Sequence, residues 1–375
     1  MSQQESTVTL LPPLKEVETP LVLRKLASAH RYLAELKGTA ATIPNESILI
    51  NTLALQEAKD SSAIENIITS HDELYKVQLF GDLLKNASAK EVNLYADALK
   101  RGFELVRQQK ILSNNHILEV QRILENNDAG YRRLPGTKLL NAATKEIVYT
   151  PPQDFDTIQQ LMHNLIDFIN NDEISKIDPL VKMAIMHYQF ESIHPFYDGN
   201  GRTGRIMNIL YLVIKDLLKL PILYLSRYII NNKKNYYRLL QEVREKENWE
   251  EWILYMLDGI EQISKETIII ISQIKELMQK YKYVIREKLP KIYSQDLLNN
   301  LFRHPYTKIE FVMDDLRVSR ITATRYLDLI ADLKLLSKQK IGRSNFYINE
   351  PLFNLFKSSA GIEDQSETIK IISSK

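Results

Sequence analysis

The run of twelve residues from His194 to Arg205 combines residue types that can bind and transfer a phosphate group. It reads His-Pro-Phe-Tyr-Asp-Gly-Asn-Gly-Arg-Thr-Gly-Arg. Gly199 and Gly201 lack side chains, so the backbone N–H groups of this turn can converge on an anion. The apolar stretch 205–214 predicts a buried helix that begins near Arg202, and a helix N-terminus attracts negative charge. The sequence therefore predicts a rigidly anchored phosphate site.

Four side chains of this run can carry the chemistry. Asp198 is a hard oxygen ligand suited to Mg²⁺, which completes its shell with phosphate oxygens and water. Arg202 and Arg205 are three residues apart, so both lie on one helix face and can reach a polyphosphate. His194 is suited to act as the general base on an incoming hydroxyl group. The combination indicates phosphoryl-group transfer.

The same residues allow other interpretations. A histidine before a proline is more often structural, and Gly-Asn-Gly by itself is an ordinary turn. The run is neither a Walker A loop nor a dinucleotide fingerprint, because the required spacings are absent. A zinc site built on His187 and His194 lacks both cysteine and the H-E-x-x-H spacing. The full set of residue types favours the phosphate interpretation.

The run resembles the signature H-x-F-x-[DE]-G-N-G-R-x-x-R of Fic proteins, which have the fido fold, at every fixed position. The resemblance implies an all-α core with a small β-hairpin flap, and transfer of AMP from ATP to a Ser, Thr or Tyr hydroxyl of a target protein. It implies that His194 takes the hydroxyl proton and that Asp198 holds Mg²⁺. The residues implied to bind the nucleotide are Gly199, Asn200, Gly201, Arg202, Thr203, Gly204 and Arg205, together with Tyr236 and Tyr237.

A second motif lies far upstream. The run Ser61-Ser62-Ala63-Ile64-Glu65-Asn66 resembles the inhibitory-helix motif [ST]-x-x-x-E-[GN] of the same family and ends a predicted helix. By itself, Glu65 would be an ordinary solvated helix charge. The resemblance implies that Glu65 pairs with Arg205 and withdraws it from the γ-phosphate of ATP. The hypothesis is an autoinhibited enzyme that a Glu65→Gly substitution activates.

Two further segments fit the resemblance. Residues between Tyr131 and Pro152 alternate around a polar stretch and predict a hairpin, the flap that docks the target segment as an added strand in this family. A surface hairpin of no special function is the alternative. Tyr236 and Tyr237 are candidates to contact the adenosine. Since neighbours on a helix point about 100° apart, we expect one of them to touch the nucleotide and the other to pack.

Composition sets limits on the function. The chain has 375 residues, with 49 basic and 47 acidic side chains and no cysteine. The small net charge of +2 indicates no bulk polyanion as partner. The absence of cysteine fits a reducing compartment. The start of the chain lacks the features of a signal peptide, and no apolar stretch reaches the ~18 residues that span a bilayer. We therefore expect a cytoplasmic protein without a membrane partner.

The resemblance and the helical spacing together predict four parts. Residues 1–105 form a helical region with the inhibitory helix, 106–285 the catalytic core, 290–356 a winged helix-turn-helix, and 357–375 a tail. Two long helices are predicted within 249–288, with Ile268-Ile269-Ile270-Ile271 buried in a core or against a partner. Pro290 predicts a linker over 287–294.

The winged helix-turn-helix prediction rests on three helices and two strands. The helices are expected at 296–302, 309–315 and 319–333, and the strands at 336–340 and 345–348. Ser319 would cap the third helix and present Arg320, Thr322 and Arg325 outward. From Lys291 to Phe356 there are ten Lys and Arg against seven Asp and Glu, a weak footprint for DNA.

Several functions stay open from the sequence. The first is a protein adenylyltransferase, with self-modification among its reactions. The second is the removal of AMP from targets, with Glu65 orienting a water molecule. The third is a DNA-binding regulator whose Fic core senses nucleotide. The intact His194, Asp198, Arg202 and Arg205 favour the transferase. A homodimer, DNA or another protein stay open as partners of the C-terminal part.

Overall fold

The structure is a computed structural model that describes residues 8–80, 86–140, 144–341 and 344–358. The predicted tail therefore lies almost entirely outside the described residues, as does the centre of the predicted turn 341–344. The chain divides into two compact units, Met1–Ile268 and Ile269–Lys375.

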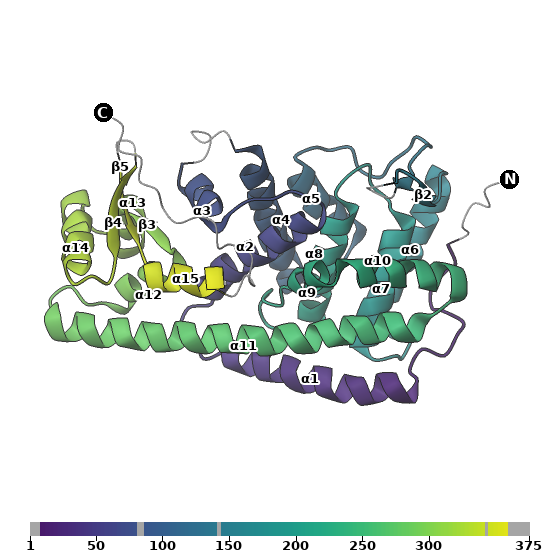
Figure 1. Cartoon of the computed structure of the whole chain (residues 1–375), viewed down its shortest axis with the longest axis horizontal. Helices are drawn as coiled ribbons and strands as arrows, with labels where there is room; N and C mark the ends of the chain where they lie inside the picture. The colour runs from purple at the N-terminus through teal and green to yellow at the C-terminus, as the bar shows by residue number, and fades with distance from the viewer. Residues whose placement is uncertain (1–7, 81–85, 141–143, 342–343, 359–375) are drawn as a thin grey trace. The chain divides into compact units, whose positions relative to one another are not determined.

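The first unit is mostly helical (Figure 1). Its helices are α1 (Pro20–Ala40), α2 (Glu46–Ile64), α3 (His71–Phe80), α4 (Ala87–Gln109), α5 (Asn114–Glu125), α6 (Phe155–Asn170), α7 (Pro179–Ile193), α8 (Asn200–Ile214), α9 (Ser226–Asn231), α10 (Lys233–Lys246) and the first part of α11 (Trp249–Lys288). The strands β1 (Leu139–Leu140) and β2 (Ile147–Tyr149) pair in antiparallel fashion. The predicted all-α core with a small hairpin is confirmed.

Local sequence explains where the central helices begin and end. The Asp178 side chain accepts a hydrogen bond from the Leu180 N–H, and Pro179 stands at the first turn of α7, a favourable start. α7 and α8 are buried on nearly all sides and pack against each other. Because a helix that is apolar all round belongs in a core, these two helices form a rigid base for the loop between them.

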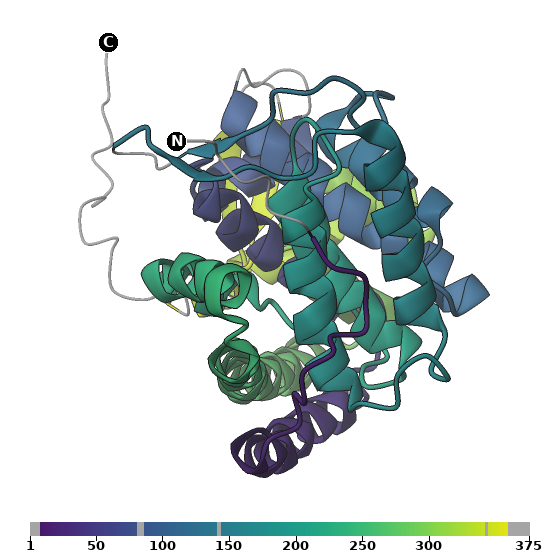
Figure 2. The ribbon, with the colours of Figure 1, turned by 90° about the vertical axis from the view of Figure 1, so that its right-hand side faces the viewer.

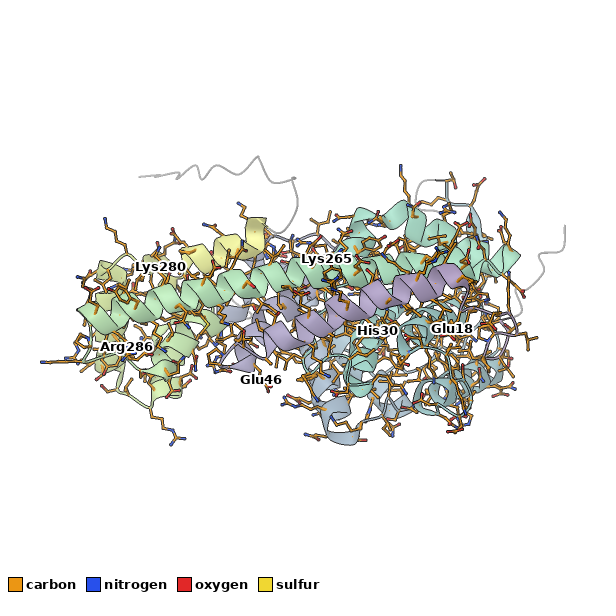
Figure 3. All side chains as sticks on the ribbon, turned by 90° about the horizontal axis from the view of Figure 1, so that it is seen from below. Glu18, His30, Glu46, Lys265, Lys280 and Arg286 are labelled. Atoms are coloured by element: carbon orange, nitrogen blue, oxygen red, sulfur yellow. The ribbon has the colours of Figure 1, made fainter. Side chains whose placement is uncertain are left out.

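α1 runs beside the first part of α11 (Figures 2 and 3). Lys25 Nζ lies 2.7 Å from Glu261 Oε2 and also pairs with Asp258. Lys265 Nζ lies 4.2 Å from the centre of the Tyr32 ring, within cation–π distance. These contacts attach the first helix of the chain to the end of the first unit.

The prediction of two helices within 249–288 is wrong, because α11 is one helix over this range. Gly259 could have interrupted it, but the glycine is used for close packing instead. A Cβ at this position would lie 2.7 Å from the Tyr228 ring and 2.8 Å from Leu225. The helix ends at Lys288, next to the predicted linker. Of the four isoleucines, Ile270 and Ile271 are buried, whereas Ile269 is exposed.

The second unit combines helices with a small sheet. After α11 come α12 (Gln295–Arg303), β3 (Tyr306–Lys308), α13 (Ile309–Leu316), α14 (Arg320–Asp332), β4 (Ser337–Ile341), β5 (Ser344–Ile348) and α15 (Glu350–Ser358). The strands pair antiparallel in the order β3-β5-β4. The three predicted helices, the hairpin and the Ser319 cap are confirmed. β3 has three residues, too few for a periodic signal, and was not predicted. α15 was not predicted either.

Candidate active site

The loop between α7 and α8 carries the run 194–205. His194 ends α7 in the left-handed conformation, with φ 50° and ψ 58°. Gly199 precedes α8 with φ 72° and ψ 12°. The Asn200 side chain closes the loop, because it accepts from the Phe196 N–H and donates to the Phe196 carbonyl, both at 2.8 Å. The amide of Asn200 is thus engaged, and the free N–H groups at the start of α8 are left for an anion.

The glycines of the turn are required by close approach. A Cβ at Gly199 would overlap the carboxylate of Glu125 and would have to sit at positive φ. A Cβ at Gly201 would lie 2.6 Å from Glu65 Oε1 and 2.8 Å from an Arg205 nitrogen. The two glycines therefore let carboxylates and guanidiniums gather against the N-terminus of α8.

Arg205 is held by the C-terminal end of α2. Its Nε donates to Ser61 Oγ at 2.7 Å, and one terminal nitrogen donates to the Ser61 carbonyl at 3.0 Å and to Glu65 Oε1 at 2.8 Å. The side chain is 3% exposed. Burial is the largest single effect and acts to lower the pKa of Arg205, but Glu65 together with Tyr236, Tyr95 and Glu191 outweighs it, so the pKa is raised. The expected contact between Glu65 and Arg205 is present in the structure.

Four carboxylates lie near Arg202, the most distant being Asp198, whose Oδ1 lies 3.9 Å from a terminal nitrogen. The three that contact it closely, which we call the Arg202 carboxylate cluster, are Glu65, Glu91 and Glu125. The Nε of Arg202 lies 2.9 Å from Glu65 Oε2, and its terminal nitrogens lie 2.5 Å from Glu91 Oε1 and 3.0 Å from Glu125 Oε1. Glu65 thus binds both arginines of the run, one with each oxygen. In this state, carboxylates surround the guanidiniums that were expected to hold phosphate.

Sequence reasoning missed Glu91 and Glu125. Glu91 lies in α4 and Glu125 is the last residue of α5, so neither is near the motif in sequence. One signal was available for Glu125, since an acidic residue is unfavourable at a helix C-terminus. Burial raises the pKa of Glu125 to about 7, with contributions from Asp198, Glu91 and Glu65, although Arg202 acts in the opposite direction.

The His194 imidazole is neutral near pH 7, because its pKa is lowered. Burial lowers its pKa to about 4, the guanidiniums of Arg132 and Arg244 act in the same direction, and the Glu191 carbonyl and Asp198 oppose them. A neutral ring nitrogen near pH 7 can accept a proton. The depressed pKa makes His194 ready to act as a base without first losing a proton, although as a weaker base than an ordinary histidine.

The two tyrosines of α10 occupy different surroundings. Tyr236 is buried, and its hydroxyl lies 2.8 Å from Nε2 of His187, which is fully buried. Tyr237 is 49% exposed. The expectation that one packs fits this difference, with Tyr236 as the packed residue.

His187 is engaged with Tyr236, and the structure shows no cluster of three or more His, Asp or Glu suited to a metal within the described residues.

Thr203 and Gly204 lie on the buried side of α8. The Thr203 side chain is fully buried. A Cβ at Gly204 would lie 3.0 Å from the Phe190 ring and 3.3 Å from Glu191 Oε1. Gly204 therefore lets α8 pack closely on α7, while the turn ahead of it presents its N–H groups.

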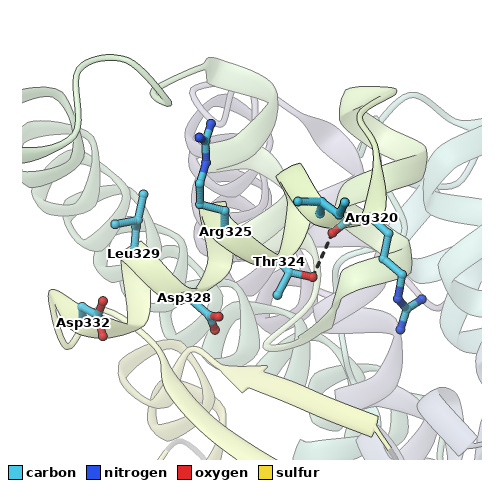
Figure 4. A pocket seen from close by; sticks show the side chains of 7 residues that line it. Arg320, Thr324, Arg325, Asp328, Leu329 and Asp332 are labelled. Atoms are coloured by element: carbon cyan, nitrogen blue, oxygen red, sulfur yellow. Dashed lines mark hydrogen bonds between the residues drawn. The ribbon is translucent and has the colours of Figure 1, made fainter.

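In the second unit, α14 presents a pocket of about 530 Å³ (Figure 4). Ser319 caps this helix, and the Thr324 hydroxyl donates to the Arg320 carbonyl at 2.8 Å. Arg320 and Arg325 are exposed as expected, whereas Thr322 is half-buried. The pocket is lined by Arg320, Ile321, Thr324, Arg325, Asp328, Leu329 and Asp332. Its lining mixes both charges, which weakens the case for a phosphate backbone as ligand.

Three family models match successive parts of the chain. The Fic/DOC family N-terminal model matches residues 23–104, and the Fic/DOC family model matches residues 111–212, which include the motif. A model described as the C-terminal domain of SoFic-like protein adenylyltransferases matches residues 277–352. The chain therefore belongs to the Fic/DOC family.

Known proteins agree with this assignment. A probable protein adenylyltransferase of Aquifex aeolicus is 28% identical over 237 residues, which are 62% of this chain and 65% of that protein. The protein adenylyltransferase fic-1 of Caenorhabditis briggsae is 31% identical over 104 residues, 28% of this chain and 20% of that protein. The chain thus spans less than two thirds of the length of these relatives.

Solved structures show the same fold. A Fic family protein from Desulfovibrio desulfuricans superposes with a TM-score of 0.59 at 20% identity, over 90% of this chain and 98% of that chain. Fic-1 from C. elegans superposes with a TM-score of 0.53 at 21% identity, over 68% and 74% of the two chains.

Within the described residues, no helix is long and apolar enough to cross a bilayer.

Proposed function

We propose that this protein is a protein adenylyltransferase that moves AMP from ATP to a Ser, Thr or Tyr hydroxyl of a target protein. The observation that carries the proposal is the shared loop of α7 and α8. It places a neutral histidine, an exposed carboxylate, a helix N-terminus and two arginines within one turn and its flanks. The family and its named relatives support the same reaction.

In the proposed reaction, His194 removes the proton from the target hydroxyl. The hydroxyl oxygen forms a bond to the α-phosphorus of ATP, and the bond from this phosphorus to the bridging oxygen breaks, so pyrophosphate leaves. The N–H groups at the start of α8 and the guanidiniums of Arg202 and Arg205 would neutralise the phosphate charge. Positioning and charge neutralisation supply most of the catalysis in phosphoryl transfer.

Asp198 fits a role in holding Mg²⁺. Its side chain is 78% exposed, and it lies in the same loop between α7 and α8 as His194. Oδ1 accepts the Gly199 N–H at 2.7 Å, which leaves Oδ2 for a cation. One carboxylate together with substrate phosphates is a common magnesium environment. The cation would offset the charge of the leaving pyrophosphate.

The contacts of Glu65 support autoinhibition. One carboxylate occupies both Arg202 and Arg205, which are the groups proposed to bind the polyphosphate. ATP would have to displace these ion pairs or bind without them, and either route weakens productive binding. We propose that the end of α2 inhibits the enzyme in this way until Glu65 is withdrawn.

We also propose a role for each part of the chain. We assign residues 1–105 to a regulatory helical region, 106–285 to the catalytic core and 290–356 to a winged helix-turn-helix. The three helices and the β4–β5 hairpin support the last assignment. The mixed charges on α14 favour protein docking over DNA as its role.

Intact-protein mass spectrometry tests the activity. Wild type, Glu65→Gly and the double variant Glu65→Gly/His194→Ala would be incubated with ATP and Mg²⁺. We expect AMP adducts on Glu65→Gly, few on wild type and none on the double variant. If Glu65→Gly binds ATP but neither carries an adduct nor modifies any protein in a cell lysate, the proposal is wrong.

A further inference from the structure

Arg132 lies fully buried at the start of the segment 131–152, called the flap here, of which residues 141–143 lie outside the described part. Its Nε donates to the His194 carbonyl at 2.8 Å. One terminal nitrogen donates to the Pro152 carbonyl and, at 3.4 Å, to the Ile193 carbonyl. Its backbone N–H donates to the Pro195 carbonyl at 2.9 Å. One residue therefore joins both ends of the flap to the loop of the proposed base.

The contact at His194 is made where the backbone needs support. A residue other than glycine adopts the left-handed conformation that His194 shows at a cost in free energy, unless the surroundings hold it. The carbonyls at a helix C-terminus also lack partners within the helix. The buried guanidinium supplies a charged donor to two of them, and such hydrogen bonds are stronger than neutral ones.

Two tyrosines add further ties between the flap and the same loop. The Tyr197 hydroxyl accepts from the backbone N–H groups of Arg133 at 2.9 Å and Leu134 at 3.1 Å. The Tyr149 hydroxyl donates to the Ser192 carbonyl at 2.8 Å. Both legs of the flap are thus hydrogen-bonded to residues 192–197. A target segment that pairs with the flap would be placed in register with His194.

We propose that Arg132 is a positioning residue that couples the flap to the general base. It fixes the backbone of His194 and the ends of the flap in one hydrogen-bonded unit, so that a docked hydroxyl and the imidazole meet in the reactive geometry. This inference rests on the proposed transferase function and adds to it a residue outside the motif. Arg132 acts through His194 and the flap.

The charge of Arg132 has a separate effect from its geometry. The groups that act on His194 are Arg132 and Arg244, which lower its pKa, and Asp198 and the Glu191 carbonyl, which raise it. Removing the positive charge of Arg132 raises the pKa of His194. As the pH is lowered, a rate that depends on neutral His194 would then begin to fall at a higher pH than before. Lysine at this position keeps the charge but lacks the fork that reaches three carbonyls.

The test compares Arg132→Lys and Arg132→Met in the Glu65→Gly background, with Arg122→Met as the control. Arg122 is an exposed arginine of α5 that pairs with Glu119. We expect both Arg132 variants to lose about 100-fold in kcat for AMP transfer, with unchanged ATP affinity, as loss of alignment predicts. The acidic limb of the rate should move to higher pH in Arg132→Met and stay in place in Arg132→Lys.

A kcat of Arg132→Met within about threefold of its parent would overturn the inference, as would equal pH profiles for the two variants. If Arg132→Met does not fold, Arg132→Lys alone tests the inference. The inference predicts that this variant loses kcat while its pH profile stays unchanged.

Hydrogen exchange separates this inference from the proposed activity. Arg132→Lys in the otherwise wild-type chain should expose the amides of residues 132–134, His194, Phe196 and Tyr197 to faster exchange, while α6 stays protected. Unchanged exchange would contradict the coupling even in an active enzyme. Absent AMP transfer by Glu65→Gly would instead count against the activity, and the exchange result would still decide whether Arg132 joins the flap to the loop.

Discussion

Glu65 and Arg205 form an ion pair in which Glu65 Oε1 lies 2.8 Å from a terminal nitrogen of Arg205. Both residues belong to helical ends that the sequence separates by 140 positions. Ser61, one turn before Glu65 on α2, adds two further contacts to the same guanidinium. The end of α2 therefore holds Arg205 through one charged acceptor, the Glu65 carboxylate, and two neutral acceptors, the Ser61 hydroxyl and carbonyl.

Removing Glu65 should destabilise the protein without nucleotide. Glu65→Gly leaves the buried Arg205 without its carboxylate, at an expected cost of about 2 kcal/mol. ATP with Mg²⁺ should restore the loss, since the triphosphate supplies negative charge. The check is the thermal unfolding midpoint of wild type and variant with and without ATP. An equal rise on adding ATP to both proteins would count against competition between Glu65 and the nucleotide.

The Arg202 carboxylate cluster should hinder ATP even after Glu65 is removed. In Glu65→Gly, Arg202 keeps Glu91 and Glu125 as partners. Neutralising one of them in Glu65→Gly/Glu125→Gln should tighten ATP binding about tenfold, or about 1.4 kcal/mol, because a carboxylate beside the phosphates repels them. Calorimetric titration measures this. Glu119→Gln is the matched control on the same helix, and weaker binding in Glu125→Gln would mean that Glu125 orients Arg202 for ATP.

The rate should tolerate moderately acidic conditions. The pKa of His194 is lowered to about 4, so the imidazole is neutral above that pH and is lost as a base only as pH falls through it. The kcat of Glu65→Gly should stay level between about pH 8 and pH 6 and fall near pH 4. ATP binding at each pH controls for Glu125, whose pKa is about 7. A half-maximal rate near pH 6.5 would indicate an ordinary histidine.

Tyr236 and Tyr237 should differ in their roles. Tyr237→Ala should weaken ATP binding about tenfold or more through the loss of ring contact with the nucleotide. Tyr236→Phe should leave ATP binding nearly unchanged and cost about 1 kcal/mol of stability, since it removes the hydrogen bond to His187. Fluorescence titration and chemical denaturation measure the two effects. Exchanged outcomes would assign the nucleotide contact to Tyr236.

Local signals explain the parts of the fold that the sequence predicted. Gly199 precedes α8 and Ser319 caps α14, because such helix starts depend on residues within one turn of each other. The apolar content of α8 predicted its burial. The single helix α11 could not be predicted in the same way, since Gly259 reads as a weak point until Tyr228 and Leu225 are seen to fill the space beside it.

The sequence by itself determined the chemistry that is available: a histidine suited to act as a base, a carboxylate suited to hold a metal, a glycine turn and two arginines in twelve consecutive residues. Their order along the chain is enough, because the loop and the helix N-terminus form from neighbours. Only the tertiary structure decided which charges face those arginines. Glu91 and Glu125 come from α4 and α5, and Arg132 from the flap, and no spacing in the sequence relates them to the motif. Long-range packing of α2, α4, α5 and α8 brings Glu91 and Glu125 to the arginines, and burial then shifts the pKa values of the groups on which the proposed regulation depends.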